Sequence, residues 1–351
     1  MRFLHIQNTD KFTEPYIKFI NKNFNFSDHL FLVITKIRNF KFENHHGNVV
    51  FILSKNVKDL LNVVRKMNLS DKIILHGLSI NWIVLLLFLQ PWLLKKSYWV
   101  VWGGDLYRYL DDKKNIKMKI YEYIRKFVIK NMGGFITHIE GDYELARNWY
   151  KAKGKYYYSF LYPSNLFKDF EAIKDVYDEK QKYILIGNSA NPSNNHIEIF
   201  DKMSKIDIKG YAIVCPLSYG DKDYARKIVI RGKEQFGDNF ISLTSFVPYN
   251  EYLDILSNVS VAIFNHKRQQ AVGNITSLLS FGKKVYIRDD ITTWNFCEEH
   301  GLKVYSLNND FQRLLEPMSK NIKVKNIEKA KTHFSVEKLI EDWKTIFNSK
   351  I

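Results

Sequence analysis

The side chains best suited to chemistry lie in a polar loop between an apolar strand, predicted over 259–264, and a short helix rich in small residues. The loop carries one arginine, Arg268, then the amides of Gln269 and Gln270, then Gly273. A strand, a loop and a helix N-terminus form an anion site, because free backbone N–H groups and the helix dipole both favour negative charge. The planar guanidinium of Arg268 suits phosphate oxygens. The Gly-Lys-Ser/Thr ending of a P-loop is missing. We interpret the segment as a cradle for the diphosphate of a nucleotide-sugar, with an ordinary solvated strand–loop–helix corner as the alternative.

Two residues in the first half of the chain are candidate general bases. His76 precedes Gly77 directly after an apolar strand, and Asp105 follows another strand, between Trp102 and Tyr107. A general base needs a pKa near the working pH. Histidine has one naturally, whereas an aspartate must be desolvated, and the two aromatic neighbours of Asp105 provide apolar surface for this. A structural histidine beside a glycine and an aspartate that caps the next helix are the alternatives.

Further polar loops follow strands in the second half of the chain. Gly187 permits backbone close to a ligand, and Ser193 or Asn194 is expected to cap the next helix. Asp221 and Asp223 form an Asp-x-Asp triplet, but their place just before a charged helix favours an acid cluster at a helix N-terminus. We therefore expect no bound metal.

Composition restricts the class of protein. The chain has 351 residues, 46% of them hydrophobic, which is enough for about two domains. Its 53 Lys and Arg against 37 acids give a net charge of +16, which suggests an anionic partner, either nucleic acid or a membrane surface. Two cysteines fit a reduced cytoplasmic protein without a disulfide framework. The apolar run 78–94 is short and interrupted for a membrane span, so we expect a buried helix that Pro91 ends, with room for a face that touches lipid.

Strands and helices alternate along the chain, which is typical of parallel sheets in doubly wound α/β folds. The first series has predicted strands over 3–6, 30–34, 48–51, 72–75, 98–102 and 134–137, and helices over 56–67, 79–90, 113–131 and 142–150. The second has predicted strands over 183–186, 211–214, 240–243, 259–264 and 284–287, and helices over 195–203, 222–236, 248–256, 276–281 and 294–299. The predicted domains are a first lobe over 1–160, a linker over 161–182, a second lobe over 183–330 and a helical segment over 331–351 that packs back on the first lobe.

The predicted helix over 113–131 is strongly basic. It carries seven lysines and arginines against one acid, Glu122, and its apolar side is expected to contain Ile116, Ile120, Ile124 and Phe127. Basic amphipathic helices lie on anionic membranes. A solvated face above a core stripe is the equal alternative.

The polar loops together resemble the bacterial 4-acetamido-4,6-dideoxygalactose (Fuc4NAc) transferases of enterobacterial common antigen synthesis. The matching pieces occur in the same order over about residues 70–300 and are His76-Gly77, Trp102-Gly103, Asp105-Leu106-Tyr107, Gly141-Asp142, Gly187-Asn188-Ser189, Ser193-Asn194, His196-Ile197, Pro216, Tyr219, Arg268-Gln269-Gln270 and Gly273. The resemblance implies a GT-B fold, with two Rossmann-like doubly wound lobes and a cleft between them. In such enzymes the second lobe holds the nucleotide-sugar and the first lobe faces the acceptor.

The same resemblance implies a reaction and a setting. The family transfers Fuc4NAc from a dTDP-sugar to an undecaprenyl-diphosphate-linked saccharide, as a peripheral protein on the cytoplasmic face of the inner membrane. We expect contact with an anionic membrane surface and no nucleic acid, no cofactor and no metal. Asp105 or His76 would take the proton of the acceptor hydroxyl, with Asp105 slightly favoured. The donor site is expected to contain Gly187, Asn188, Ser189, Tyr219, Arg268, Gln269, Gln270, Gly273, Asn274 and Thr276. A basic nucleic-acid-binding protein and a non-catalytic assembly factor on the same fold are the alternatives.

Overall fold

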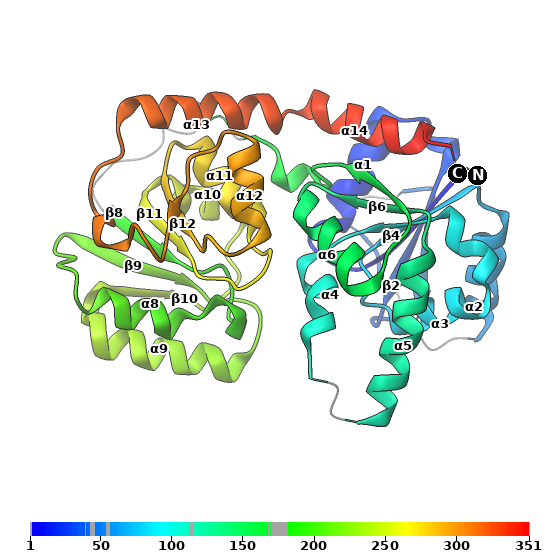
Figure 1. The fold of residues 1–351 in the computed structure, drawn as a ribbon, viewed down its shortest axis with the longest axis horizontal. Helices are drawn as coiled ribbons and strands as arrows, with labels where there is room; N and C mark the ends of the chain where they lie inside the picture. The colour runs from blue at the N-terminus through cyan, green and yellow to red at the C-terminus, as the bar shows by residue number, and fades with distance from the viewer. Residues whose placement is uncertain are drawn as a thin grey trace. The chain divides into compact units, whose positions relative to one another are not determined.

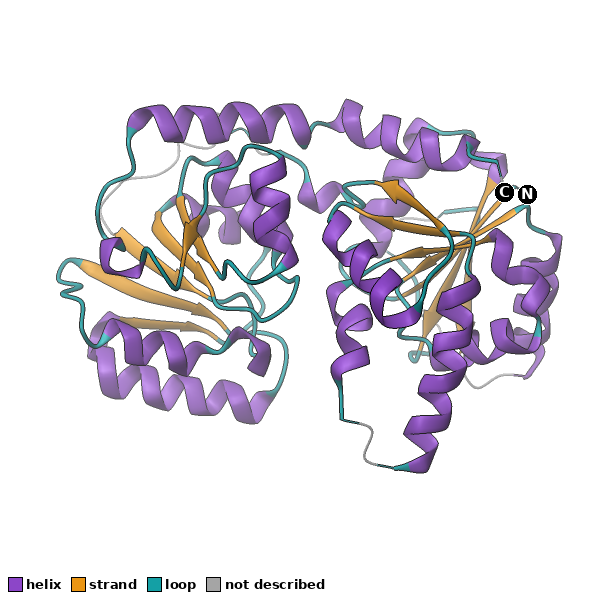
Figure 2. Ribbon diagram, viewed as in Figure 1, coloured by secondary structure: helices purple, strands orange, loops and turns teal. Residues whose placement is uncertain are grey.

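The computed structural model describes residues 2–38, 40–42, 46–53, 57–112, 115–167, 169 and 182–350. The chain divides into two compact α/β units (Figures 1 and 2). Unit 1 consists of Met1–Ser164 and Val336–Ile351, and unit 2 consists of Asn165–Ser335. Among the described residues, none of the helices combines the length and apolar character needed to cross a membrane.

Unit 1 is built on a sheet whose seven described strands all run parallel. The strands are β1 (Phe3–Asn8), β2 (His29–Thr35), β3 (Val49–Leu53), β4 (Lys72–His76), β5 (Ser97–Val100), β6 (Gly134–Thr137) and β7 (Lys155–Tyr158). Their order is β3-β2-β1-β4-β5-β6-β7, so the direction of winding reverses between β1 and β4. Open parallel sheets bind ligands outside the carboxyl ends of their strands, at this switch point.

Helices cover both faces of this sheet (Figure 1). The described helices of unit 1 are α1 (Thr13–Asn23), α2 (Val57–Leu69), α3 (Asn81–Leu89), α4 (Gly103–Leu106), α5 (Ile116–Asn131), α6 (Glu140–Tyr150) and α14 (Val336–Asn348), with short 3₁₀ turns that include η2 (Pro91–Lys96) and η3 (Tyr107–Leu110). One face packs side chains such as Leu4, Leu32 and Trp99 against α2, α3, α5 and α6. The other face lies under α1 and α14, whose Tyr16 and Trp343 have their ring centroids 5.1 Å apart.

Hydrogen bonds from buried side chains hold the final helix, α14, against unit 1. The indole N–H of the fully buried Trp343 donates to the carbonyl oxygen of Leu161 at 3.1 Å. The ammonium of Lys72, on β4, donates to the carbonyl oxygens of Ile346 at 2.6 Å and Ser349 at 3.0 Å, which caps the helix C-terminus. Burial lowers the pKa of Lys72 to about 8, so this buried cation depends on those carbonyl partners.

Unit 2 repeats the design with six described parallel strands. The strands are β8 (Lys182–Ile186), β9 (Tyr211–Pro216), β10 (Phe240–Leu243), β11 (Val259–Phe264), β12 (Lys284–Ile287) and β13 (Tyr305–Ser306), in the order β10-β9-β8-β11-β12-β13. The described helices are α8 (His196–Met203), α9 (Lys222–Phe236), α10 (Tyr249–Ser257), α11 (Val272–Ser280), α12 (Thr292–Glu299) and α13 (Lys320–His333). Helices α8 and α9 cover one face, and α10 to α12 cover the other (Figure 1). The switch point of this sheet lies between β8 and β11.

Several elements differ from the prediction. Helices α1 and α13 and strand β7 were not expected, and the helix expected over 276–281 begins earlier, at Val272. In α5, Ile116 is 68% exposed and Ile120 is 55% exposed, whereas Ile124 packs against the core. The expected apolar side is therefore divided, with most of it facing outward. Arg125, one of the seven lysines and arginines counted in the predicted helix, is fully buried. Residues 113–114 of the predicted helix lie outside the described part of the chain.

Candidate active site

A polar network occupies the switch point of unit 2, between the loops that follow β8 and β11. The amide nitrogen of Gln270 donates to the side-chain oxygen of Asn188 at 3.0 Å, and the amide nitrogen of Asn188 donates to the hydroxyl of Tyr219 at 3.0 Å. Ser193 donates its hydroxyl to the side-chain oxygen of Gln270 at 2.7 Å. Three residues of the predicted donor site, 31 to 82 positions apart in sequence, are therefore in direct contact.

The buried side chain of Asn194 holds this network in place. The side-chain oxygen of Asn194 accepts from the backbone N–H of Asn188 at 2.8 Å and lies 2.9 Å from Nε2 of His266. Its amide nitrogen donates to the hydroxyl of Ser189 at 3.2 Å. Burial lowers the pKa of His266 to about 3, so the ring is neutral and donates through Nε2. Asn194 thus positions the β8 loop, and it is Asn195, with φ of 49°, that precedes α8. The expectation that Ser193 or Asn194 caps α8 is wrong.

The backbone conformation and the close packing at position 187 require a glycine. Its φ is +72°, and a Cβ there would lie 2.5 Å from Nε2 of His196 and 2.7 Å from the side-chain oxygen of Asn194. Only glycine combines this backbone conformation with so close an approach. The close passage lets the β8 loop turn directly over the buried side chains of His196 and Asn194.

The loop after β11 ends in an unusual helix start. Ala271, at φ of +61°, precedes α11, so Gly273 and Asn274 belong to the first turn of the helix. Arg268 is half-buried in this loop, and its guanidinium donates to the carbonyl oxygen of Gln269 at 3.1 Å. The backbone N–H of Asn274 donates to the carbonyl oxygen of Ala271 at 2.9 Å. The expected cationic end of the site therefore depends on Arg268 and on the dipole of α11. Thr276 differs from the expectation, because its hydroxyl is buried and donates to the carbonyl oxygen of Gly273 at 3.1 Å.

In unit 1, Asp105 lies in α4, directly after β5. One carboxylate oxygen accepts from the backbone N–H of Leu78 at 2.7 Å and from the indole N–H of Trp99 at 2.8 Å. The other oxygen accepts from the backbone N–H of Trp102 at 2.9 Å, as a helix cap does. Burial raises the pKa of Asp105 to about 6, and these donors and the nearby Arg125 act in the opposite direction. Asp105 therefore ties together the loops after β4 and β5.

His76, at the end of β4, belongs to a buried row of hydrogen-bonding side chains. Its Nδ1 lies 2.9 Å from the hydroxyl of Tyr162, which also accepts from the indole N–H of Trp102 at 3.2 Å. Its Nε2 lies 3.3 Å from Nδ1 of His5, whose Nε2 lies 3.0 Å from Nδ1 of His29. Burial lowers the pKa of His76 to about 3 and that of His29 to about 4. The imidazoles are neutral near pH 7, and both nitrogens of His76 are engaged.

This geometry favours a positioning role for Asp105 and His76. The prediction that one of them is the general base stays a prediction, because it needs a measured rate. A third candidate was missed from the sequence. Asp10 follows β1 at the same switch point, where Asn8 donates to the hydroxyl of Ser79 at 2.9 Å.

Asp10 presents one carboxylate oxygen to its own chain. That oxygen accepts from the backbone N–H groups of Phe12 at 2.7 Å and Thr13 at 3.1 Å. No hydrogen bond from a described residue reaches the other oxygen, Oδ2. Desolvation raises the pKa of Asp10, although these hydrogen bonds oppose the shift. The residue as a whole keeps an exposed surface although its carboxyl group is partly desolvated, so a substrate hydroxyl has access to it.

The acidic residues weighed as metal ligands have structural partners. Asp221 is the N-cap of α9 and accepts from the backbone N–H groups of Asp223 at 2.9 Å and Tyr224 at 2.8 Å. Asp223 pairs with the guanidinium of Arg226. Across the residues that the structure describes, no group of three or more His, Cys, Asp or Glu side chains is placed to hold a metal ion.

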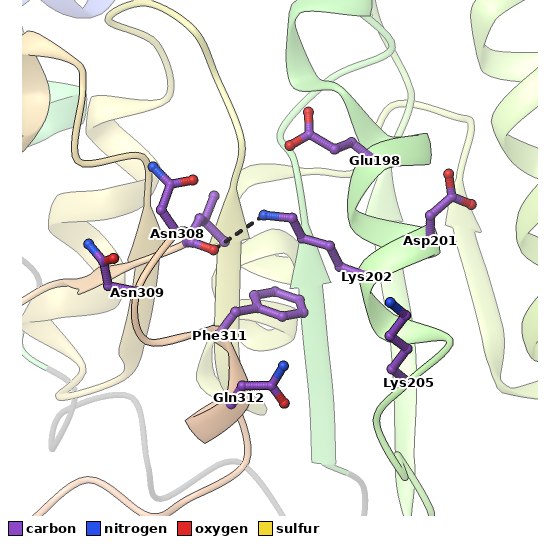
Figure 3. A pocket seen from close by; sticks show the side chains of 9 residues that line it. Glu198, Asp201, Lys202, Lys205, Asn308, Asn309, Phe311 and Gln312 are labelled. Atoms are coloured by element: carbon purple, nitrogen blue, oxygen red, sulfur yellow. Dashed lines mark hydrogen bonds between the residues drawn. The ribbon is translucent and has the colours of Figure 1, made fainter.

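A separate hollow of about 450 Å³ lies in unit 2, between α8 and the segment after β13 (Figure 3). It is lined by Glu198, Asp201, Lys202, Lys205, Leu307, Asn308, Asn309, Phe311 and Gln312. The ammonium of Lys202 reaches across it to the carbonyl oxygen of Leu307 at 3.3 Å (Figure 3). Its two cations are balanced by two carboxylates, none of the four is buried, and it shares no residue with the predicted donor site.

Two parallel-sheet Rossmann-like units, each with a polar switch point, define the GT-B class of glycosyltransferase fold. Solved structures agree over nearly their whole length. They include sucrose-phosphate synthase from Thermosynechococcus elongatus, with a TM-score of 0.73, 10% identity, and coverage of 99% of this chain and 98% of that chain. HepE of Anabaena in complex with UDP matches with a TM-score of 0.72 and 10% identity, and the match covers 100% of both chains. WaaG, a glycosyltransferase involved in lipopolysaccharide biosynthesis, matches with a TM-score of 0.66 and 7% identity, covering 99% of this chain and 100% of that chain.

The family is established by sequence. The profile of the 4-alpha-L-fucosyltransferases, glycosyl transferase group 56, matches residues 8–350, so the chain belongs to this glycosyltransferase family. The family includes the Fuc4NAc transferase, which confirms the resemblance seen in the polar loops. The enzyme therefore uses a nucleotide-sugar donor and a glycosyl acceptor.

Proposed function

We propose that this glycosyltransferase moves a deoxyamino sugar, Fuc4NAc or a close relative, from a dTDP-sugar to an undecaprenyl-diphosphate-linked saccharide. The product would enter a bacterial surface polysaccharide such as enterobacterial common antigen. The family match supports transfer over the nucleic-acid-binding and assembly-factor alternatives. The observation that carries the donor assignment is the contact of Asn188, Tyr219 and Gln270 at the β8/β11 switch point.

The donor diphosphate is assigned to Arg268 and the first turn of α11. The helix N-terminus and the guanidinium both stabilise negative charge, and the amides and hydroxyl of the network offer hydrogen bonds to sugar or base. The negative charge that develops on the departing dTDP is met by these groups, so we propose turnover without a divalent metal. Excess chelator should leave the rate unchanged. A rate that vanishes and returns with Mg²⁺ would move the assignment to Asp221 and Asp223.

The acceptor is assigned to the β1/β4 switch point of unit 1. There the acceptor hydroxyl gives its proton to an enzymic base while its oxygen bonds to the sugar C1 and the C1–phosphate bond breaks, its electron pair leaving with dTDP. Asp105 and His76 are the bases proposed from the sequence, and Asp10 joins them because its Oδ2 is unengaged by any described residue. A general base must lie within about 3 Å of the hydroxyl.

The lipid-linked acceptor defines the proposed location. An undecaprenyl chain stays in the bilayer, so the enzyme must work at the cytoplasmic face of the inner membrane, as a peripheral protein. A net charge of +16 supports attraction to its anionic lipids.

A screen of nucleotide-sugars for thermal stabilisation tests the donor assignment. A ligand that binds only the native state stabilises it by RT ln(1 + [L]/Kd), so at equal concentration the ligand that binds more tightly raises the melting temperature more. We expect dTDP and dTDP-Fuc4NAc to stabilise the protein more than UDP- or GDP-sugars at equal concentration. Stabilisation by UDP-sugars alone would reject dTDP as the nucleotide, and no stabilisation by any of them would reject the donor site.

A further inference from the structure

Helix α5 has apolar side chains on two opposite sides. Its inward side contains the buried Val128 and Ile129, which pack in the core of unit 1. Its outward side contains Ile116, Ile120, Tyr123 and Phe127, which are 68%, 55%, 73% and 38% exposed. These four residues are spaced four, three and four positions apart, so they form one stripe along the helix. A soluble helix needs only one apolar side, so the outward stripe requires a partner.

Neighbouring elements extend the stripe. Helix α3 packs beside α5, where the rings of Phe88 and Phe127 have centroids 5.3 Å apart. In Figure 1 the first turns of α5 project from the body of unit 1. We define the α3–α5 face as the exposed apolar residues of α3, η2 and η3 together with the outward stripe of α5, namely Leu85, Leu89, Trp92, Leu110, Ile116, Ile120, Tyr123 and Phe127.

Charge identifies the kind of partner. At 3.6 residues per turn, Lys119, Lys126 and Lys130 run along one flank of the stripe. The one acid of the helix, Glu122, lies 3.6 Å from the guanidinium of the buried Arg125 and so faces inward. Within α5, the apolar stripe is flanked by lysines and carries no outward acid, and the exposed Asp111 and Asp112 come before the helix. Such a stripe matches a bilayer with anionic head groups, because the apolar residues enter the acyl boundary while the ammonium groups reach phosphate.

The same helix is tied to the candidate acceptor site. The buried guanidinium of Arg125 donates to the backbone carbonyl oxygen of Asp105, in the short helix α4 that follows β5. Arg108, in the next turn, η3, donates to the side-chain oxygen of Asn81 at 3.2 Å, at the start of α3. The α3–α5 face therefore adjoins the carboxyl-end loops of unit 1. A saccharide whose lipid anchor lies in the bilayer would meet these loops directly.

We propose that the α3–α5 face is the membrane-docking surface of this protein, and that its outward stripe inserts into an anionic bilayer. This rests on the proposed function only for the identity of the lipid-linked acceptor. The occupant is the bilayer itself, and a second copy of the chain or a protein partner is the competing outcome.

Vesicle flotation tests the insertion. The double variant Ile120→Ser/Tyr123→Ser should bind vesicles of phosphatidylglycerol and phosphatidylcholine at least about tenfold more weakly than wild type, because two apolar side chains leave the acyl boundary. The matched control is Leu61→Ser/Ile230→Ser, at positions 65% and 60% exposed outside this face. Equal binding by wild type and the Ile120/Tyr123 variant would overturn the proposal.

A triple variant tests the contribution of the three lysines beside the stripe. Replacing Lys119, Lys126 and Lys130 by Gln should weaken binding to the anionic vesicles about 100-fold and flatten its salt dependence, since each lysine near anionic lipid contributes about 1 kcal/mol. The control replaces the exposed Lys325, Lys329 and Lys331 of α13 by Gln. An equal loss in the control would reject a local lysine row in favour of overall charge.

Two further measurements separate the competing outcomes. If the wild type is a dimer by light scattering and Ile120→Ser/Tyr123→Ser makes it monomeric without changing vesicle binding, the face belongs to a second copy and the proposal is wrong. With a water-soluble short-chain acceptor, the face variants should keep wild-type turnover and lose it only with acceptor in vesicles. If the wild-type protein binds the vesicles as expected but transfers no sugar from dTDP-Fuc4NAc, the proposed function is wrong and the membrane-docking surface is still supported.

Discussion

Gln270 and Asn188 join the two loops of the unit 2 switch point, with the amide nitrogen of Gln270 donating to the side-chain oxygen of Asn188 at 3.0 Å. The contact brings the loop after β8 to the loop after β11, which ends at the start of α11. Polar side chains that bond across a switch point outline a preformed ligand site, because both loops are held in place before the ligand arrives.

Arg268 should be the largest single contributor to binding of the donor diphosphate. Removing a charge-assisted pair costs on the order of 1.5–3 kcal/mol, so Arg268→Ala should weaken dTDP binding by about 10- to 150-fold in calorimetry. The control is Arg313→Ala, an exposed arginine of unit 2 that pairs with Glu316. Unchanged dTDP affinity in a folded Arg268→Ala protein would remove Arg268 from the site.

Gly187→Ala should destabilise unit 2 and weaken donor binding together. The added methyl group meets Nε2 of His196 at 2.5 Å, and the residue would have to keep a φ of +72°. Gly210→Ala is a matched control, since its φ is +84° but nothing lies within 4 Å of an added Cβ. Both variants carry the backbone strain, of about 1 kcal/mol or more, and only Gly187→Ala carries the clash. Denaturant unfolding should therefore show a larger loss for Gly187→Ala, and equal losses would contradict the close packing under the β8 loop.

Three variants decide which group is the general base. Loss of a base costs about 10²–10⁴-fold in kcat while dTDP affinity is kept. Asp10→Asn keeps a side-chain oxygen that can accept from the backbone N–H groups of Phe12 and Thr13, so the fold should survive. Asp105→Asn loses an acceptor for its three N–H donors and should also lower the melting temperature. His76→Gln removes the third candidate.

Asp28→Asn, at the amino end of the same sheet, is the control for these three variants. The true base variant should also lose the acidic limb of the pH–rate profile. If all three candidates turn over within about threefold of wild type, no enzymic base acts here, and a retaining mechanism without one becomes the better account.

Stability should fall steeply in acid. Burial lowers the pKa of His76 and His266 to about 3 and of His29 and His196 to about 4. The unfolded state, with histidine pKa values near 6.5, then binds more protons than the native state below about pH 6.5, so stability present above that pH is lost as the pH falls towards 4. Each such histidine contributes about 1.4 kcal/mol per pH unit.

Asp105 opposes this trend. Its raised pKa, about 6, lets the native state bind the extra proton between about pH 4 and 6. The pKa values of Asp10 and Asp342 are raised as well, mainly by desolvation. The pKa of the buried His5 is lowered like those of the other four histidines, so five histidines outweigh three carboxyls and the net slope keeps its sign. Urea unfolding at pH 7, 6 and 5 should show a progressive loss of unfolding free energy, and a constant or rising value would show that the histidines are not buried as neutral rings.

The sheets were predictable because their strands are short apolar runs between polar loops. The runs at β6, β10, β11 and β12 were placed with the bounds that the structure has. Helix α13 was missed because only Asn326 and Ala330 of its fourteen residues are buried, which leaves little amphipathic signal. The start of α11 was misplaced because Ala271, in a left-handed conformation, carries none of the usual capping side chains.

The sequence indicated which loops belong to the candidate site, but it did not indicate which side chains of those loops form hydrogen bonds with one another. Gly187, Asn188, Tyr219 and Gln270 were expected together because their loops follow predicted strands and because they match the family that the sequence resembles. The support from Asn194 to His266 joins residues 72 positions apart, and the row from His5 to His76 depends on strand order. Neither relation has a local sequence signal, since both arise only when the sheets assemble.

Transfer of the sugar itself tests the central claim most directly. Purified protein would be incubated with dTDP-Fuc4NAc and an undecaprenyl-diphosphate-linked saccharide in anionic vesicles, and the lipid product would be followed by mass spectrometry. We predict one added Fuc4NAc residue on the acceptor with release of one dTDP, at a rate that Arg268→Ala lowers. Release of dTDP without any glycosylated lipid, or transfer only from a UDP-sugar, would contradict the proposed reaction.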